Sequence, residues 1–393
     1  MSGESSNLRA LPDRTPVIIA ARRLPTAKAG GAYKALRAHE LAAPVLSGVL
    51  ADAGIAASEV CDVILGNATG GGGNVARLAA LTAGCPEHVP GLTVDRQCGS
   101  GLEAVVLACR LIQAGAGDTY IAGGVESIST APARAHRRPD GSLDFFERAQ
   151  FAPLKSGDPD AGVAAENVAR RFGISRERQD EYALESHRRA NAADAAGHFS
   201  GELVPLAGVT ADAGPHRKLT PALMARFPAV FVEGVTVTAA NSCPYSDGAA
   251  AVVVTTAAKA RTLDAHGLVF VDSAVAGTDP NFLGVGAAYS TLALMKRTGL
   301  DKAAVNRGLI EFNEAFASQV LAVADLLGVD PAMFNREGGA LALGHPYGAS
   351  GAVSVVRLFA QAAARAEPGL GALAMISMAG GMGISTEFRW SVL

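Results

Sequence analysis

Cys98 stands at the start of an apolar helix in the stretch VDRQCGSGLEAVVLACRLIQAG (94–115). Gly99 and Gly101 keep side-chain bulk out of the turn, and the apolar residues beyond them recur at helical spacing. A thiol at a helix N-terminus faces unpaired N–H groups and the positive end of the helix dipole. We therefore expect a nucleophilic cysteine with a pKa below the usual value of about 8.5. Cys109, deep in the same helix, is expected to be a packing residue.

Two further residues suit acid–base or oxyanion chemistry. His345 lies in GGALALGHPYGASG (338–351), and it is the one histidine of eight in a glycine-dense turn just before a helix. Asn313 lies in EFNEAFASQ (311–319), at the end of an apparent buried strand. Open α/β sheets place their sites at the carboxyl ends of strands, which favours a functional Asn313. The same residue could instead cap the helix that follows it.

Short apolar strands alternate with helices around these residues. The strands are predicted at 16–21, 62–66, 92–95 and 119–123, and the helices at 41–54, 75–84 and after Cys98. This alternation predicts an α/β protein whose sheet is covered by helices on both faces.

The pattern occurs twice along the chain. QCGSG opens a helix and is followed by TYIAGG, and YGASG (347–351) opens a helix that is followed by AMISMAGG (374–381). DVILGNA (62–68) similarly matches GLIEFNE (308–314). We interpret this as two similar α/β halves. Their superposition would put Gly348 in the place of Cys98, with His345 one turn upstream near the pseudo-twofold axis.

A polar region rich in Pro and Gly separates the repeated elements. It includes a charged helix over 175–197, with Ser175 as the expected N-cap and Gly197 as the expected C-cap. Long structured excursions of this kind commonly cover an active site. The predicted domains are an N-terminal half (1–125), an inserted loop domain (126–235), a return segment of the first half (236–265) and a C-terminal half (266–393).

Composition excludes several classes of protein. The chain has 393 residues, a net charge of −3 and no dense basic cluster, so nucleic acid is not an expected partner. No apolar run is long enough to span a membrane, and the polar N-terminal segment lacks the core of a signal peptide. Five cysteines without a CxxC pair disfavour disulfides and a metal site. We expect a cytoplasmic protein with reduced thiols.

At these motifs the chain resembles the thiolase family. The resemblance lies in VDRQCGSG, NEAFA and GGALALGHPYGASG, and extends to TAANSCPYSDGAA (238–250) and 162–190, so it covers nearly the whole chain. It implies two fused βαβαβαββ halves in a five-layer α-β-α-β-α arrangement, an inserted loop domain, and coenzyme A thioesters as substrates without a bound cofactor. It thus implies an acetyl-CoA C-acyltransferase, which condenses acyl-CoA or cleaves 3-ketoacyl-CoA in fatty acid or ketone metabolism.

The resemblance also implies roles for individual residues. Cys98 would carry the acyl group as a thioester, and His345 would activate it. His345 and a water held by Asn313 would form one oxyanion hole. The backbone N–H of Cys98 would form the second hole with an N–H of Ala379 or Gly380. Each hole would supply donors worth on the order of 3 kcal/mol.

The family's second cysteine, the acid/base on the last strand, has no counterpart. A gapless alignment puts Ser377 there, and a shift of one residue puts Met378 there. A serine hydroxyl does not rest as an anion at neutral pH, so it is a poor general base. The chain could be a thiolase slowed at proton abstraction, or one in which His345 or a water takes the proton. It could also join the acyl group to another nucleophile, or to a carbanion made by decarboxylation.

Other positions bear on the substrate and on assembly. Asp160 falls where short-chain biosynthetic members carry a histidine, and Cys243 falls where the family has a serine near the pantetheine. Further substrate-binding candidates are Phe316 and, for the CoA phosphates, Arg217, Lys218 and Arg226; the three basic residues fit a solvated face equally well. The loop over 126–162 is a few residues short, which favours a homodimer over a homotetramer.

Two rival classes remain. In GNATGGGGNVARLAA (66–80), Gly71, Gly73 and Ala76 satisfy GxGxxA and Asp95 follows about 20 residues on, as in NAD-binding oxidoreductases. Four consecutive glycines satisfy many such patterns, so this signal is weak. The missing second cysteine also admits a non-catalytic, thiolase-like CoA-binding protein.

Overall fold

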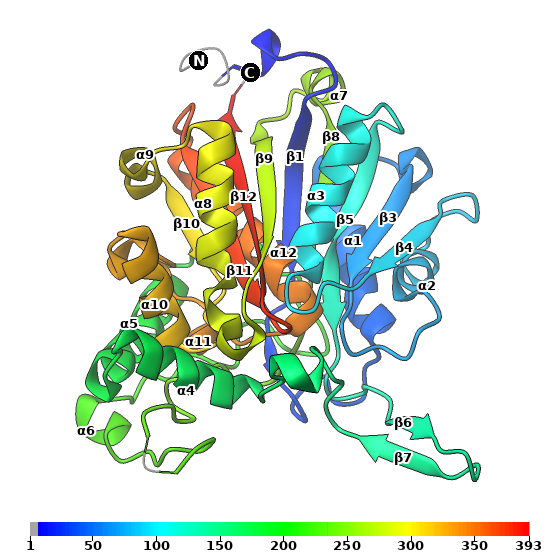
Figure 1. Cartoon of the computed structure of the whole chain (residues 1–393). Helices are drawn as coiled ribbons and strands as arrows, with labels where there is room; N and C mark the ends of the chain where they lie inside the picture. Colours follow the sequence, from blue (N-terminus) through cyan, green and yellow to red (C-terminus); the bar gives the residue numbers. More distant parts are fainter. Residues whose placement is uncertain (1–6, 234, 393) are drawn as a thin grey trace.

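The computed structural model describes residues 7–233 and 235–392, and its main feature is a ten-stranded sheet (Figure 1). The strands run in the order β10-β11-β12-β9-β1-β8-β5-β3-β4, and β2 pairs with β8 off this path. Their bounds are β1 (Pro16–Arg23), β2 (Ala27–Lys28), β3 (Asp62–Gly66), β4 (Gly91–Val94), β5 (Thr119–Glu126), β8 (Ser246–Thr256), β9 (Gly267–Gly277), β10 (Leu309–Phe312), β11 (Gly371–Met378) and β12 (Met382–Ser391).

The sheet consists of two halves with the same strand order. The first half reads β4-β3-β5-β8-β1, and the second reads β10-β11-β12-β9, with a parallel bridge between Ile310 and Phe334 in the place of the outermost pair. In both halves the outer pairs are parallel and the inner pairs are antiparallel. β1 and β9 pair at the centre and join the halves. The predicted repeat is confirmed.

Helices form three layers around these strands. The longer helices are α1 (Ala38–Ala53), α2 (Val75–Thr82), α3 (Ser100–Gln113), α8 (Gly286–Thr298), α10 (Ala317–Leu327) and α12 (Tyr347–Arg365). α3 and α12 pack against each other between the two halves, α1 and α2 cover one outer face, and α8 and α10 cover the other. The predicted five-layer α/β arrangement is therefore confirmed.

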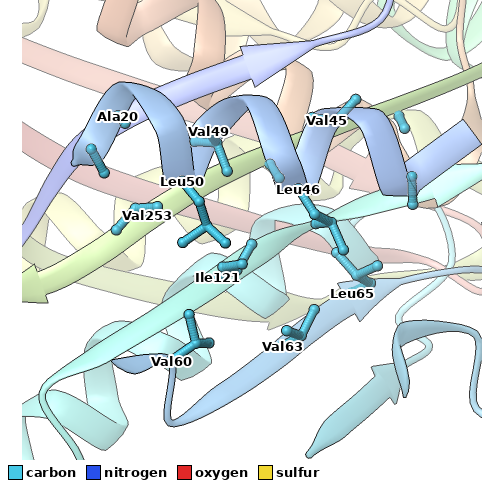
Figure 2. Close-up of a cluster of buried hydrophobic side chains, with 14 of the residues drawn as sticks. Ala20, Val45, Leu46, Val49, Leu50, Val60, Val63, Leu65, Ile121 and Val253 are labelled. Carbon is cyan, nitrogen blue, oxygen red and sulfur yellow. The ribbon is translucent and has the colours of Figure 1, made fainter. Parts of the chain in front are cut away.

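Strand sequences explain the layers, because successive side chains point to opposite faces. In β3, Val63 and Leu65 join the core under α1, whereas Ile64 joins the central core around α3 and α12. Figure 2 shows Leu46 and Leu50 of α1 lying over the first of these faces. A strand that is buried on both faces must be apolar throughout, which is why these strands read as continuous apolar runs.

The segment between β5 and β8 adds smaller elements that lie below the sheet in Figure 1. They are β6 (Arg134–Arg137), β7 (Leu143–Phe146), η4 (Leu154–Ser156), α4 (Ala161–Phe172), α5 (Arg176–Ala195) and α6 (Pro221–Met224). α4 and α5 pack on α10, whereas β6 and β7 form a projecting hairpin. Ser175 caps α5 as predicted, and Gly197, with φ +76°, follows the C-cap Ala196. The predicted domain boundaries themselves stay a prediction.

Short helices complete the chain. They are η2 (Leu8–Ala10), η3 (Ala57–Glu59), α7 (Ala257–Thr262), η5 (Pro280–Val285), α9 (Lys302–Arg307), η6 (Pro331–Met333) and α11 (Ala340–Leu343). Over residues 7–233 and 235–392, no helix has the length and apolar character needed to cross a membrane. Residues 1–6 of the polar N-terminal segment lie outside the described residues.

Candidate active site

Cys98 lies in a tight turn between β4 and α3. Gln97, just before it, has a left-handed backbone with φ +51°, which is uncommon for a residue other than glycine. The Asp95 carboxylate accepts from the Gln97 N–H at 2.8 Å. The Ser100 hydroxyl accepts from the Arg96 N–H at 2.7 Å and donates to the Gln97 carbonyl at 2.6 Å. These local bonds fix the cysteine at the mouth of the helix.

The thiol of Cys98 is only partly exposed, and this changes its expected acidity. Burial raises its pKa to about 12, which outweighs the favourable backbone N–H groups of Ala379 and of Cys98 itself. The carboxylates of Glu126 and Asp95 raise the pKa further. The expectation of a lowered pKa was therefore wrong, because the covering layers remove water from the helix N-terminus. The Ala379 amide nevertheless interacts with the sulfur, and its role in an oxyanion hole stays a prediction.

His345 is buried two residues before α12. Its Nδ1 lies 2.6 Å from the Ser350 hydroxyl, and its backbone N–H donates to the Ser246 hydroxyl at 3.2 Å. The imidazole meets the Tyr347 ring edge to face, with centroids 5.1 Å apart. Burial lowers the pKa of His345 to about 3, so the ring is neutral at physiological pH. With Nδ1 occupied, Nε2 is the nitrogen left to act on a substrate.

The N-terminal ends of α3 and α12 meet through small residues. The Gly348 carbonyl lies so close to Gly66, Gly101 and Gly124 that a Cβ on any of the three would overlap it. The two helices pack symmetrically, since Gly101 abuts the Ala352 backbone and Gly351 abuts the Leu102 backbone. Positions 101 and 351 are thus equivalent, which places Gly348 opposite Cys98 as predicted.

Glu126, a fully buried carboxylate, ties this junction together. It accepts from the Gly348 N–H at 2.9 Å, from the Asn67 amide at 2.9 Å and from the backbone N–H groups of Ala68 and Thr69. The amides of Ala68 and Thr69, which lead into the glycine loop, are therefore already occupied. The glycine loop serves the junction of the two halves, and nothing in its geometry favours the NAD hypothesis.

Asn313 directly follows β10 and is 5% exposed. Its Nδ2 has no hydrogen-bond partner within the described part of the chain. Asn67 follows β3 at the equivalent place in the first half, and its Nδ2 donates to Glu126 and to the Val125 carbonyl. The alternative role of Asn313 as a helix cap is wrong, because α10 begins at Ala317 with Phe316 as N-cap. A buried amide without a partner is costly, which makes Asn313 a candidate for a functional donor.

A cavity of about 20 Å³ lies beside Asn313, and its lining includes Ser350, Glu311 and Arg357. The Nε of Arg357, a fully buried side chain, also lacks a partner among the described residues. This volume has room for one water molecule, and the lining offers donors and acceptors to hold it. The cavity therefore connects the free donor of Asn313 with the serine that orients His345.

The end of β11 does not bring Ser377 to Cys98. The Ser377 hydroxyl donates to the Gly284 carbonyl at 2.7 Å and accepts from the Ala287 N–H at 2.9 Å, so it faces the start of α8. Met378 points the other way, and its sulfur packs against Gly99. This geometry does not support a catalytic Ser377. The one-residue shift in alignment, which selects Met378, fits the structure better.

The turn after β11 approaches the loop segment. Gly380 has φ +77°, and a side chain there would press on the Phe151 carbonyl at 3.1 Å. Ala379 and Gly380 thus lie between Cys98 and the loop over 148–162. The first AGG, residues 122–124, is instead part of β5, where Gly123 and Gly124 fit against β8 and α12. The first AGG sequence is therefore part of a strand, and the second forms the turn after β11.

The predicted substrate contacts fall in different surroundings. Cys243 is partly exposed and interacts electrostatically with Cys98. Phe316 is buried and meets Phe231 edge to face, with centroids 6.0 Å apart. Asp160 is exposed and pairs with Arg148 at 2.8 Å.

The three basic candidates are all exposed on one stretch of loop. Arg217 pairs with Asp194 at 3.1 Å, and Lys218 and Arg226 also face solvent. The structure thus leaves both of their predicted roles open. No cluster of side chains able to hold a metal ion occurs among the described residues.

Sequence reasoning missed Ser350, Tyr347 and Glu126. Ser350 could have been found, because it lies in the same glycine-dense motif as His345. Tyr347 lies in the same motif, and it interacts electrostatically with Cys98 and Cys243. Glu126 could be recognised only from the fold, since it joins elements that are far apart in the chain.

Comparisons with known proteins agree with this geometry. The family model described as "Thiolase, N-terminal domain" matches residues 16–258, and "Thiolase, C-terminal domain" matches residues 267–389. The chain is 45% identical over 380 residues, 95% of its length and 98% of the relative's, to "Putative acetyl-CoA C-acetyltransferase YhfS" of Bacillus subtilis. It is 44% identical over 352 residues, 87% of its length and 92% of the relative's, to VraB of Staphylococcus aureus, which has the same designation.

A solved structure is also similar. The crystal structure of the Bacillus anthracis acetyl-CoA acetyltransferase superimposes with a TM-score of 0.88 at 32% identity, covering 96% of this chain and 98% of that one. The two family models span the motifs around Cys98, Asn313 and His345, and the relatives and the solved structure cover most of the chain. The chain belongs to the thiolase family of acyltransferases.

Proposed function

We propose that the chain is an acetyl-CoA C-acyltransferase that carries its acyl group on Cys98. The observation that carries this proposal is the position of the Cys98 thiol, held at the start of α3 against the Ala379 amide. The start of α12 abuts the start of α3 and follows a neutral, oriented His345. The substrates are acyl-CoA thioesters, the class named for the relatives, and the reaction needs no bound cofactor.

The resting site holds a neutral thiol and a neutral imidazole. Burial raises the pKa of Cys98 and lowers that of His345, so neither group ionises alone near neutral pH. Proton transfer from Cys98 to Nε2 of His345 therefore accompanies attack of the sulfur on the thioester carbon. Nδ1, held by Ser350, keeps the ring in the orientation that this transfer needs.

Two sets of donors serve the two oxyanions of the reaction. The N–H groups of Cys98 and of Ala379, with Gly380 adjacent, would stabilise the tetrahedral oxyanion of the acyl group. Asn313, through a water in the adjacent cavity, would act with His345 on the thioester oxygen of the incoming acyl-CoA. Preorganised donors of this kind are each worth on the order of 3 kcal/mol in the transition state.

We further propose a cytoplasmic homodimer. β4 lies at the edge of the described sheet, with β3 as its one strand neighbour there. Leu78, Leu81 and Leu92 are 40–44% exposed on α2 and β4, next to this edge. An apolar sheet edge of this kind suits a second copy of the chain. A homotetramer would need additional contacts, for which the projecting β6–β7 hairpin is the candidate.

Acyl exchange tests the function without requiring condensation. Acetyl-CoA is mixed with isotopically labelled CoA, and the appearance of labelled acetyl-CoA is followed in the wild type and in Cys98→Ala. We expect exchange in the wild type and its loss in the variant, because exchange requires an acyl-enzyme. Tight CoA binding by calorimetry without exchange from any acyl-CoA would instead indicate a CoA-binding protein.

The decarboxylative alternative has its own readout. Malonyl-CoA is supplied to the acetylated enzyme, and release of CO₂ is compared with carbon–carbon bond formation from acetyl-CoA. Condensation with acetyl-CoA supports the proposal. Condensation that occurs only with release of CO₂ from malonyl-CoA supports the alternative.

A further inference from the structure

The proposed condensation needs a group that takes a proton from the α-carbon of the second thioester. The family's position for this group offers none here, because the Ser377 hydroxyl faces α8 and Met378 fills the space beside Gly99. His345 already serves Cys98. The site therefore requires another side chain that can both give and accept a proton.

The segment over 242–246 lies between the two elements that carry Asn313 and His345. On one side Ser242 forms a bridge with Phe316, and the Cys243 N–H donates to the Ala315 carbonyl at 2.9 Å. On the other side Tyr245 forms a bridge with His345. The segment is thus fixed to the loop after Asn313 and to the turn of His345 at once. Cys243, at its centre, cannot move independently of either group.

The thiol of Cys243 has side chains of the site as neighbours. The residue is partly exposed, whereas Cys109 in the core is fully buried. Its thiol interacts electrostatically with Cys98 and with Glu314, and Tyr347 interacts with both cysteines. The two thiols are therefore close enough to influence each other's ionisation.

Tyr347 is a weaker candidate for the same role. Burial and the neighbouring Tyr245 raise the pKa of its hydroxyl above the usual value of a phenol. The Tyr347 hydroxyl already has a side-chain hydrogen-bond partner in Tyr245.

We propose that Cys243 is the second acid/base of this active site, in place of the cysteine that β11 lacks. This inference rests on the proposed function. During acylation, Cys98 passes its proton to His345 and forms the new C–S bond, while the departing CoA sulfur takes the proton of Cys243. During condensation, the Cys243 thiolate takes the α-proton, the carbanion attacks the acyl carbon, and Cys98 leaves and recovers its proton from His345. All protons and electron pairs are accounted for without another reactant.

The resting state agrees with this sequence of steps. Burial and the neighbouring Cys98 raise the pKa of Cys243, so it starts as a neutral thiol able to give a proton. It becomes a base only after that proton has left with CoA. The site thereby avoids two adjacent thiolates.

Cys243→Ser and Cys243→Ala test the proposal, with Cys61→Ser, at an exposed cysteine, as the control. In D₂O, acetylated enzyme exchanges the methyl protons of acetyl-CoA for deuterium, which NMR or mass spectrometry follows. We expect the exchange rate and condensation to fall on the order of a hundredfold or more in both Cys243 variants, since a general base contributes at least this much. Cys61→Ser should exchange at the wild-type rate, and the KM for acetyl-CoA should change little in Cys243→Ser.

Acylation by 4-nitrophenyl acetate separates this inference from the proposed function, because nitrophenolate leaves without a proton. The Cys243 variants should still be acetylated on Cys98 by this ester. Wild-type exchange rates in acetylatable Cys243→Ser would overturn the role of Cys243. Failure of Cys98 to be acetylated in the wild type would overturn the proposed function instead.

A second measurement avoids substitution at Cys243. In Cys61→Ser enzyme, Cys98 is protected as the acetyl thioester and accessible thiols are capped with methyl methanethiosulfonate. Capping of Cys243, mapped by peptide mass, should abolish deuterium exchange, and reduction of the cap should restore it. Full exchange with Cys243 capped would contradict the proposal.

Discussion

Asn67 and Asn313 occupy equivalent positions after β3 and β10, but only the side-chain nitrogen of Asn67 has partners. Asn67 donates to Glu126 and to the Val125 carbonyl and so holds the junction of the two halves. The nitrogen of Asn313 faces no acceptor among the described residues and lies beside a cavity with room for a water. One asparagine of the pair has a structural role, and the other is available for chemistry.

Alanine at these two positions should therefore affect different properties, turnover for Asn313 and stability for Asn67. Asn313→Ala should reduce turnover by about 10²–10³, because an oxyanion donor is lost, while its melting temperature stays near that of the wild type. Asn67→Ala should lower the free energy of unfolding by about 1–3 kcal/mol, because Glu126 and Val125 lose a buried partner. Steady-state kinetics and urea unfolding measure both. Equal destabilisation by the two substitutions would mean that Asn313 is structural too.

The acidity of Cys98 predicts how the free enzyme reacts with iodoacetamide. With a pKa of about 12, the thiolate fraction should rise about tenfold per pH unit from about pH 7 to about pH 10. An exposed thiol would instead level off near its usual pKa of about 8.5. Peptide mass mapping gives the rate at Cys98, with Cys61 as an internal reference. A plateau below about pH 9 at Cys98 would show that the helix N-terminus outweighs burial.

The geometry of β11 indicates which single substitution by cysteine would restore the family's arrangement. Met378→Cys should put a thiol beside Cys98 and raise the rate of α-proton exchange, most visibly when Cys243 is serine. Ser377→Cys should bring no such gain, since its side chain faces Gly284 and Ala287. It should also lose stability, at about 1 kcal/mol for each hydrogen bond weakened. A faster Ser377→Cys enzyme would show that strand β11 presents its other face to the site.

Substitution of Ser350 should cause a milder loss of turnover, because Ser350 acts through its hydrogen bond with His345. Ser350→Ala removes the partner of Nδ1, so the ring loses its fixed orientation and its preferred tautomer. We expect kcat to fall about tenfold, the equivalent of about 1.4 kcal/mol, with KM for acetyl-CoA nearly unchanged. Ser350→Thr keeps the hydroxyl and serves as the matched control. Equal losses in both variants would point to packing of α12 rather than to the hydrogen bond.

The sequence predicted much of this architecture for physical reasons. β3 begins and ends at the predicted residues, because a strand buried on both faces is apolar throughout and its ends are abrupt. Ser175 was identifiable as an N-cap because capping is a local interaction. The repeat could be recognised because both halves need small residues where α3 and α12 pack closely, as at Gly101 and Gly351.

Other features depend on contacts that the sequence does not display. The raised pKa of Cys98 comes from the layers that cover it, and a helix N-terminus considered alone predicts the opposite shift. The choice between Ser377 and Met378 depends on one residue of register, and such a step moves a side chain to the other face of the sheet. That the Asn313 side-chain nitrogen has no partner among the described residues follows only from the three-dimensional positions of the surrounding acceptors.

The central claim is that Cys98 carries the acyl group as a thioester. Wild-type protein is incubated with acetyl-CoA, quenched in acid and measured by intact mass, alongside Cys98→Ala and Cys109→Ala. We predict one added acetyl group in the wild type and in Cys109→Ala, lost on treatment with hydroxylamine, and none in Cys98→Ala. An adduct that persists in Cys98→Ala, or its absence from folded wild-type protein with every acyl-CoA tried, would contradict the account.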